Sequence, residues 1–198
     1  DLNKSQLSNQ VLLDCIRSLN EFEDKVNKTR VYVNYRALDV EELGSIYEGL
    51  LELEPEIINE GNTIEFSYSK GTGRSSSGSH YTPEDLVKPL IKHSLEYLIV
   101  DRATPFYKGK DSKEGAIEKL LDLKICDVAC GSGHILLSAA RRLAMEVARI
   151  ESGEQQPNPT SFRTALRKVI QTCIYGVDKN PLAVELCKVS LWLEAHVP

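Results

Sequence analysis

Residues 125–137 join a short apolar run, two closely spaced glycines and the start of a helical pattern. The run predicts a buried strand over 124–128, and the residues after Gly133 place apolar side chains at helical spacing. Gly131 and Gly133 permit a tight turn that a side chain would obstruct. Free backbone N–H groups at a helix start can face a ligand, and Asp127 lies at the strand end where open α/β sheets bind ligands. A turn of this kind can also simply close a packing corner, so this segment alone leaves cofactor binding open.

A second strand and helix follow about fifty residues later, against roughly twenty in a minimal nucleotide-binding unit. Residues 173–177 form another apolar strand, which ends in Asp178. Asn180 is a predicted helix N-cap and Pro181 the first helical position. A carboxylate here can accept both hydroxyls of a ribose, although an isolated one is equally a helix cap or a surface acid. An inserted loop and helix over 152–170 account for the longer spacing.

A third signal lies in residues 77–86, Ser-Gly-Ser-His-Tyr-Thr-Pro-Glu-Asp-Leu. Thr82 is a predicted N-cap, with Pro83 at the first helical position and Asp85 as the capping-box acid. Nothing in this spacing requires more than a well-formed helix start.

Together and in this order, the three segments resemble the S-adenosylmethionine-dependent DNA adenine-N6 methyltransferases of single-chain type II (type IIG-like) restriction–modification and phage-defence systems. Ser-Gly-Ser-His-Tyr-Thr-Pro is similar to the family's N-terminal cofactor motif, Asp-Val-Ala-Cys-Gly-Ser-Gly-His to its glycine motif, and Tyr-Gly-Val-Asp-Lys-Asn-Pro-Leu-Ala-Val-Glu-Leu to its ribose-acid motif. Residues 43–52 resemble a helical segment upstream of these motifs. Val128 stands where the family usually has proline, which leaves Asp127 and both glycines unchanged.

The resemblance implies an α/β chain with the Rossmann-like class I methyltransferase fold, an incomplete sheet and a helical N-terminal part. It implies S-adenosylmethionine as cofactor and no metal. The glycine motif is expected to hold the methionine part of the cofactor. Asp178 is expected to accept the ribose hydroxyls, with the next two residues beside the adenine. Segment 81–83 is expected to close over the methionine carboxylate and amino group. The expected cofactor-binding residues are Tyr81, Thr82, Pro83, Asp127, Ala129, Gly131, Gly133, Asp178, Lys179 and Asn180.

The family's catalytic Asn-Pro-Pro-Tyr or Asn-Pro-Pro-Phe does not occur in these 198 residues. The Asn-Pro pairs at 158–159 and 180–181 lack the second proline and the aromatic residue. Because the tetrapeptide comes well after the ribose acid in the family, we expect a fragment of a longer enzyme, without catalytic residues and inactive alone. The parts that bind double-stranded DNA are expected beyond residue 198.

Other functions fit parts of the pattern. A dinucleotide-dependent dehydrogenase would have a third glycine where Leu136 stands. An RNA or protein methyltransferase would share the cofactor half, although residues 43–52 favour DNA. A non-catalytic cofactor-binding or docking module is a further alternative. The sequence carries no signal for an oligomeric state.

The amino-acid composition further limits the class of protein that this chain can be. A 41% hydrophobic fraction is enough for a core, whereas a net charge of −5 argues against strong DNA binding by this segment alone. Residues 39–65 contain acids and no Lys or Arg, which favours a solvated face over a contact for a basic partner. Five irregularly spaced cysteines predict reduced thiols in a cytoplasmic protein. No apolar run is long enough to span a membrane, and no signal peptide is evident.

Periodicity predicts two domains, a helical N-terminal region with a possible hairpin (1–75) and the N-terminal part of the cofactor-binding domain (76–198). In the first we expect an amphipathic helix over 7–26 whose core stripe is Leu12, Leu13, Ile16, Leu19 and Phe22. A second helix is expected to be capped by Asp39 and Glu42, with inward-facing Leu43, Ile46, Tyr47, Leu50 and Leu51, followed by a hairpin around 60–62 and a linker over 70–79. Further expected elements are helices over 82–100, 113–123 and 161–170 and loops over 102–112 and 152–160.

Overall fold

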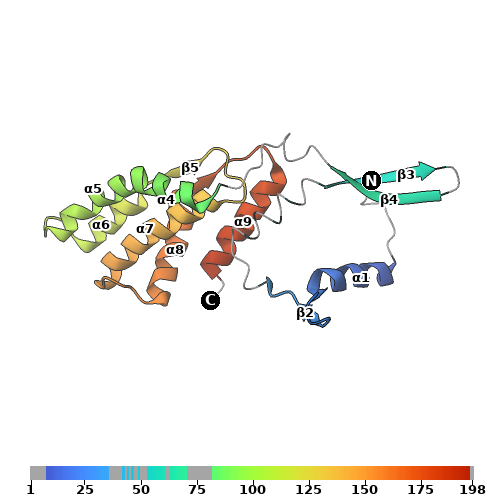
Figure 1. Ribbon diagram of the computed structural model, residues 1–198. Helices are drawn as coiled ribbons and strands as arrows, with labels where there is room; N and C mark the ends of the chain where they lie inside the picture. The colour runs from blue at the N-terminus through green and yellow to red at the C-terminus, as the bar shows by residue number, and fades with distance from the viewer. Residues whose placement is uncertain are drawn as a thin grey trace. The chain divides into compact units, whose positions relative to one another are not determined.

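The structure is a computed structural model that describes residues 8–35, 42, 44, 46, 49, 53–60, 63–70 and 82–196. The chain divides into two compact units, Asp1–Asp39 and Val40–Pro198. The predicted boundary between residues 75 and 76 lies outside the described residues and stays a prediction. In chain order (Figure 1) the elements are α1 (Asn9–Asn20), β1 (Glu21–Glu23), β2 (Arg30–Tyr32), β3 (Leu53–Glu60), β4 (Thr63–Lys70), α4 (Glu84–His93), α5 (Leu95–Tyr107), α6 (Lys113–Leu121), β5 (Ile125–Asp127), α7 (His134–Ser152), α8 (Pro159–Cys173), β6 (Ile174–Gly176) and α9 (Pro181–His196).

The first unit holds a shorter helix than predicted. α1 begins after Ser8, whose Oγ accepts from the N–H of Val11, and it ends at Asn20, so the helix predicted over 7–26 is wrong beyond that residue. The chain continues into β1, which pairs antiparallel with β2. The reversal is made at Asp24, whose Oδ1 accepts the N–H of Val26 at 2.9 Å in an Asx turn that the helical pattern concealed.

The apolar stripe predicted as a core in this unit is exposed. The five side chains are exposed by 45% to 65%, namely Leu12, Leu13, Ile16, Leu19 and Phe22. The described part of this unit, one helix and a two-stranded ribbon, provides no second apolar layer to cover such a stripe.

The predicted hairpin is confirmed. β3 and β4 pair antiparallel over their full length, from Leu53 opposite Lys70 to Glu60 opposite Thr63. In the predicted second helix, residues 42, 44, 46 and 49 are helical, but Ile46 is 50% exposed rather than inward-facing. Asp39, Leu43, Tyr47, Leu50 and Leu51 and the linker residues 71–79 lie outside the described residues.

The two motif strands are adjacent and parallel, as predicted. β5 and β6 pair with Ile125 opposite Ile174 and Asp127 opposite Gly176. α7 and α8 connect them, and their buried apolar side chains form the main core with α5 and α6 (Figure 1). α7 begins at His134, as the apolar spacing predicted, and ends at the left-handed Gly153. The β-α-β connection therefore brings the glycine motif and the ribose acid to one edge of the strand pair.

The helices before β5 differ from the prediction. α4 starts at Glu84 with Pro83 at the N-cap position, so Thr82 is not the cap, and the helix predicted over 82–100 is interrupted at Ser94. α5 then runs through Pro105, where a loop was predicted. Ala103 is buried and Phe106 packs against the core, and this packing outweighs the polar composition of that stretch.

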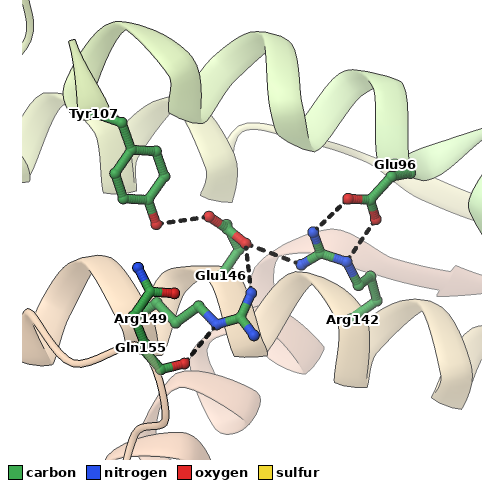
Figure 2. A network of polar contacts seen from close by, with 6 residues as sticks. All are labelled: Glu96, Tyr107, Arg142, Glu146, Arg149 and Gln155. Atoms are coloured by element: carbon green, nitrogen blue, oxygen red, sulfur yellow. Dashed lines mark hydrogen bonds and ion pairs between the residues drawn. The ribbon is translucent and has the colours of Figure 1, made fainter.

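A polar network holds α5 against α7 (Figure 2). The guanidinium of Arg142 donates two hydrogen bonds to Glu96, at 2.6 and 2.7 Å, and a third at 3.1 Å to Glu146. Glu146 is 6% exposed, and it also accepts the hydroxyl of Tyr107 at 2.8 Å. Desolvation, followed by this contact with Glu146, raises the pKa of Tyr107 to about 12. The network fixes α7, which follows the glycine turn, to α5.

Across the described ranges, no helix combines the length and the apolar character that crossing a membrane requires.

Candidate cofactor site

The turn between β5 and α7 depends on two glycines for different reasons. Gly131 has φ +52° and Gly133 has φ +94°, both in the left-handed region. A Cβ added at Gly133 would lie 2.6 Å from Sγ of Cys187, whereas one added at Gly131 would have no atom of a described residue within 4 Å. Gly133 is therefore required by packing on α9, and Gly131 leaves an open space above the turn.

Hydrogen bonds join this turn to the end of β6. The N–H of Val177 donates to the carbonyl of Asp127 at 2.8 Å, and the N–H of Cys130 donates to the carbonyl of Val177 at 3.0 Å. The N–H of Gly131 donates to Oδ2 of Asp178 at 2.9 Å. The glycine motif and the ribose acid, predicted separately from the sequence, are thus in direct contact.

Asp178 supports both loops at once. Its second oxygen, Oδ1, accepts the N–H of Asn180 at 2.8 Å. Asn180 in turn caps α9 by accepting the N–H of Leu182 at 3.0 Å, and Pro181 is the first helical residue, so both predictions for this helix start are confirmed. Each carboxylate oxygen has two lone pairs, so Asp178 keeps acceptor capacity for a ligand beyond these bonds.

Asp127 differs from Asp178 in having one oxygen without a partner. Its Oδ1 accepts the N–H of Ala129 at 3.0 Å. Its Oδ2 is buried, and no hydrogen-bond partner for it exists among the described residues. A buried acceptor without a partner is unfavourable by roughly 1–3 kcal/mol, so this oxygen favours a ligand that donates a hydrogen bond.

The expected free N–H groups of the turn are used within the protein. Ala129 donates to Asp127, Gly131 to Asp178, and Gly133 to the carbonyl of Cys130 at 2.8 Å. In this conformation the three residues shape the cradle through their backbone path rather than by donating to a ligand.

The first motif is tied to the turn through a residue to which the sequence assigned no role. Nδ1 of His134 lies 3.0 Å from the carbonyl oxygen of Thr82. Tyr81 lies outside the described residues, Pro83 is exposed, and the side chain of Lys179 is exposed. The helical pattern identified His134 only as a helix start, because a contact across 52 residues leaves no local signal.

Two buried thiols lie beneath the turn. Cys130 and Cys187 belong to one small buried cluster, together with Leu136. Desolvation, with a smaller effect of Cys130, raises the pKa of Cys187 to about 12, so this thiol stays protonated at neutral pH. The pair fills the space under Gly133 and serves packing rather than nucleophilic chemistry.

Comparison with known proteins bears on this arrangement. Residues 39–196 match the family model described as N-6 DNA Methylase. "Putative type II restriction enzyme and methyltransferase RM.MjaORFECS2P" of Methanocaldococcus jannaschii is 26% identical over 72% of this chain and 14% of its own length. Type II restriction enzyme and methyltransferase RM.Eco57I of Escherichia coli is 26% identical over 77% of this chain and 14% of its own length. DNA methyltransferase A of Bacillus subtilis is 27% identical over 62% of this chain and 14% of its own length.

The chain thus spans a small part, 14%, of each of these relatives. No solved structure matches it significantly. The family match covers the hydrogen-bonded turn, the acid after β6 and the start of α4. The chain belongs to the N-6 DNA methylase family.

Proposed function

We propose that this chain forms the S-adenosylmethionine-binding part of an adenine-N6 DNA methyltransferase of a restriction–modification or phage-defence system. Membership of the N-6 DNA methylase family and the names of the relatives support the class. The observation that carries the proposal is the buried Oδ2 of Asp127, which has no partner among the described residues and lies next to the turn whose Gly131 N–H donates to Asp178.

The residues present suit this cofactor. Oδ2 of Asp127 would accept a hydrogen bond from the methionine amino group, which satisfies the buried oxygen. The remaining lone pairs of Asp178 would accept the two ribose hydroxyls, with Lys179 and Asn180 beside the adenine. Gly131 leaves room for the methionine part above the turn, and Ala129 and Gly133 set its backbone path.

The fold and boundary that go with this function are also part of the proposal. We assign the β5-α7-α8-β6 unit to a Rossmann-like class I methyltransferase domain that begins near residue 76. The parallel pairing of β5 and β6 supports the assignment. Segment 81–83 would close over the methionine carboxylate, and the protein would act in the cytoplasm.

In the proposed reaction the bound cofactor supplies the methyl group from its positively charged sulfur atom. The carboxylates of Asp127 and Asp178 hold the donor in one orientation, and catalysis rests mainly on that positioning. The target adenine of double-stranded DNA leaves the helix to reach the site. Its amino group needs acceptors, which the Asn-Pro-Pro-aromatic residues supply in the family and which residues 1–198 do not contain.

Two measurements test the function. Calorimetry should detect S-adenosylmethionine binding and no comparable binding of NAD. Tighter binding of NAD than of S-adenosylmethionine would instead indicate a dehydrogenase. In the longer protein that contains this chain, radiolabelled methyl groups should enter DNA at adenine N6. Label in RNA or protein but never in DNA would overturn the substrate, and DNA labelling by residues 1–198 alone would refute the role of the missing tetrapeptide.

A further inference from the structure

His134 occupies a buried position at the joint of two motifs. It is the first residue of α7 and is 7% exposed. Its Nδ1 lies 3.0 Å from the carbonyl oxygen of Thr82. Because a carbonyl oxygen only accepts, the ring nitrogen is the donor, and the bond fixes a hydrogen on Nδ1. The ring therefore joins the start of α7 to the segment that leads into α4.

The start of α4 has no side-chain cap of its own. Pro83 occupies the N-cap position without a side-chain hydrogen bond, and the N–H groups of Leu86 and Val87 bond to its carbonyl at 2.9 and 3.2 Å. Since Ser, Thr, Asp and Asn are the residues that cap from the N-cap position, Pro83 leaves this helix start weakly defined locally. The bond from His134 supplies an external fixed point one residue earlier, at Thr82.

The other side of the ring is held firmly. Gly133 packs directly on the thiol of Cys187, and Gly131 is bonded to Asp178. The contacts of the turn with α9 and with Asp178 therefore also fix the position of the His134 ring. The contact links the position of the turn to that of Thr82.

We propose that His134 is a positioning residue, whose hydrogen bond to the carbonyl of Thr82 fixes Thr82 and Pro83 beside the glycine turn. What that segment contacts rests on the proposed function, whereas the tether itself does not. In the proposed site, losing the tether leaves Thr82 and Pro83 without their fixed point while the two carboxylates keep their places.

Three variants separate this role from a general contribution to stability. His134→Leu removes the donor. His134→Asn keeps one, because its Nδ2 can donate from near the place of Nδ1, whereas His134→Gln carries its donor one methylene farther out. Cys173→Ala is the matched control. It removes the hydrogen bond from the Cys173 thiol to the carbonyl of Leu121, which also joins residues 52 positions apart. This bond lies at the opposite end of the strands.

Two readouts are measured for each variant in the protein that contains this chain. The dissociation constant of S-adenosylmethionine should rise about tenfold in His134→Leu and His134→Gln, and less than about threefold in His134→Asn. Amide exchange at Leu86 and Val87 should accelerate about tenfold in the same two variants. Cys173→Ala should lower the unfolding midpoint without changing either readout.

Each outcome decides something. Unchanged exchange in His134→Leu, or in His134→Gln if the leucine variant does not fold, overturns the tether. Faster exchange with unchanged cofactor affinity overturns the positioning role while keeping the contact. Equal affinity losses in His134→Asn and His134→Gln point to ring packing rather than to the hydrogen bond, and overturn the proposal. If the wild type binds no S-adenosylmethionine, the proposed function fails, and the exchange data still decide the tether.

Discussion

At the carboxyl ends of β5 and β6 the chain turns through two left-handed glycines and leaves one oxygen of Asp127 buried without a partner among the described residues. At the amino ends, Leu123 and Cys173 are buried, and the Cys173 thiol donates to the carbonyl of Leu121. The buried thiol at this end thus has its partner within the protein. The carboxyl end is ordered by hydrogen bonds that still leave acceptor capacity unused. The two ends of the same strand pair therefore differ in whether a buried polar group still lacks a partner among the described residues.

The largest expected effect comes from Gly133→Ala at the carboxyl end. The added Cβ would meet the Cys187 thiol at 2.6 Å in a backbone conformation with φ +94°. Left-handed strain of about 1–2 kcal/mol and overpacking of about 1–3 kcal/mol should lower the free energy of unfolding by about 2–5 kcal/mol. Urea denaturation measures it. Adding Cys187→Ala should restore only the packing part, and a single variant as stable as the wild type would show that the turn is not constrained by α9.

Asp127→Asn should separate ligand binding from stability. The amide can still accept from Ala129, so the free energy of unfolding should change by less than about 1 kcal/mol. The affinity for S-adenosylmethionine should fall by about 1.5–3 kcal/mol, the contribution of a hydrogen bond between charged partners. Calorimetry tests this against Asp122→Asn, whose carboxylate is 77% exposed near the amino end. Equal affinities in the two variants would remove Asp127 from the site.

Asp178→Ala should weaken cofactor binding by about 1–3 kcal/mol, because the ribose hydroxyls lose their acceptor. It should also lower stability, since the N–H groups of Gly131 and Asn180 lose their partner. The two effects are read separately by calorimetry and by thermal denaturation of the same protein. A stability loss with unchanged affinity would leave Asp178 a purely structural residue.

Cys173→Ala tests the amino end. Removing a fully buried thiol and its bond to Leu121 should lower the free energy of unfolding by about 1–2 kcal/mol. Cofactor affinity should stay within about twofold of the wild type, because folded molecules keep an intact carboxyl end. An affinity loss larger than this, measured well below the unfolding midpoint, would mean that the two ends are coupled.

The smallest effect is expected in the α5–α7 network, away from both ends. The hydrogen bonds from Arg142 hold the pKa of Glu96 below its ordinary value of 4.5. A lowered pKa in the folded state contributes stability above pH 4.5 that is lost as the pH falls below it. After solvent screening this amounts to about 0.5 kcal/mol. Melting curves from pH 3 to 6 should therefore be slightly less pH-dependent in Glu96→Gln, and an identical profile would contradict the assignment.

The parts of the fold that the sequence predicted are those with strong local periodicity. The apolar strands before Asp127 and Asp178, the glycine turn and the long apolar stripe of α7 each carry their own signal, and so does the β3–β4 hairpin. The adjacency of β5 and β6 followed from the handedness and parallel order of β-α-β units. The closeness of the glycine turn and Asp178 could therefore be predicted from the sequence.

What the sequence could not predict depends on contacts far apart in the chain. α5 continues through Pro105 because its neighbours are buried on the core, which local composition does not report. The stripe of α1 has the spacing of a core face, but it is exposed among the described residues of its unit. The N–H groups of the turn were expected to be free, yet Asp127, Cys130 and Asp178 accept them.

The bond between Gly131 and Asp178 has a thermodynamic consequence for the proposed site. It links the loop under the methionine part with the acid under the ribose, so a molecule that orders one loop also orders the other. Such coupling is reciprocal. When one half of a ligand orders its loop, less conformational entropy of the protein is left to be lost when the other half binds. A compound with both halves should then bind more tightly than the separate halves imply, and the two subsites act as one cooperative unit.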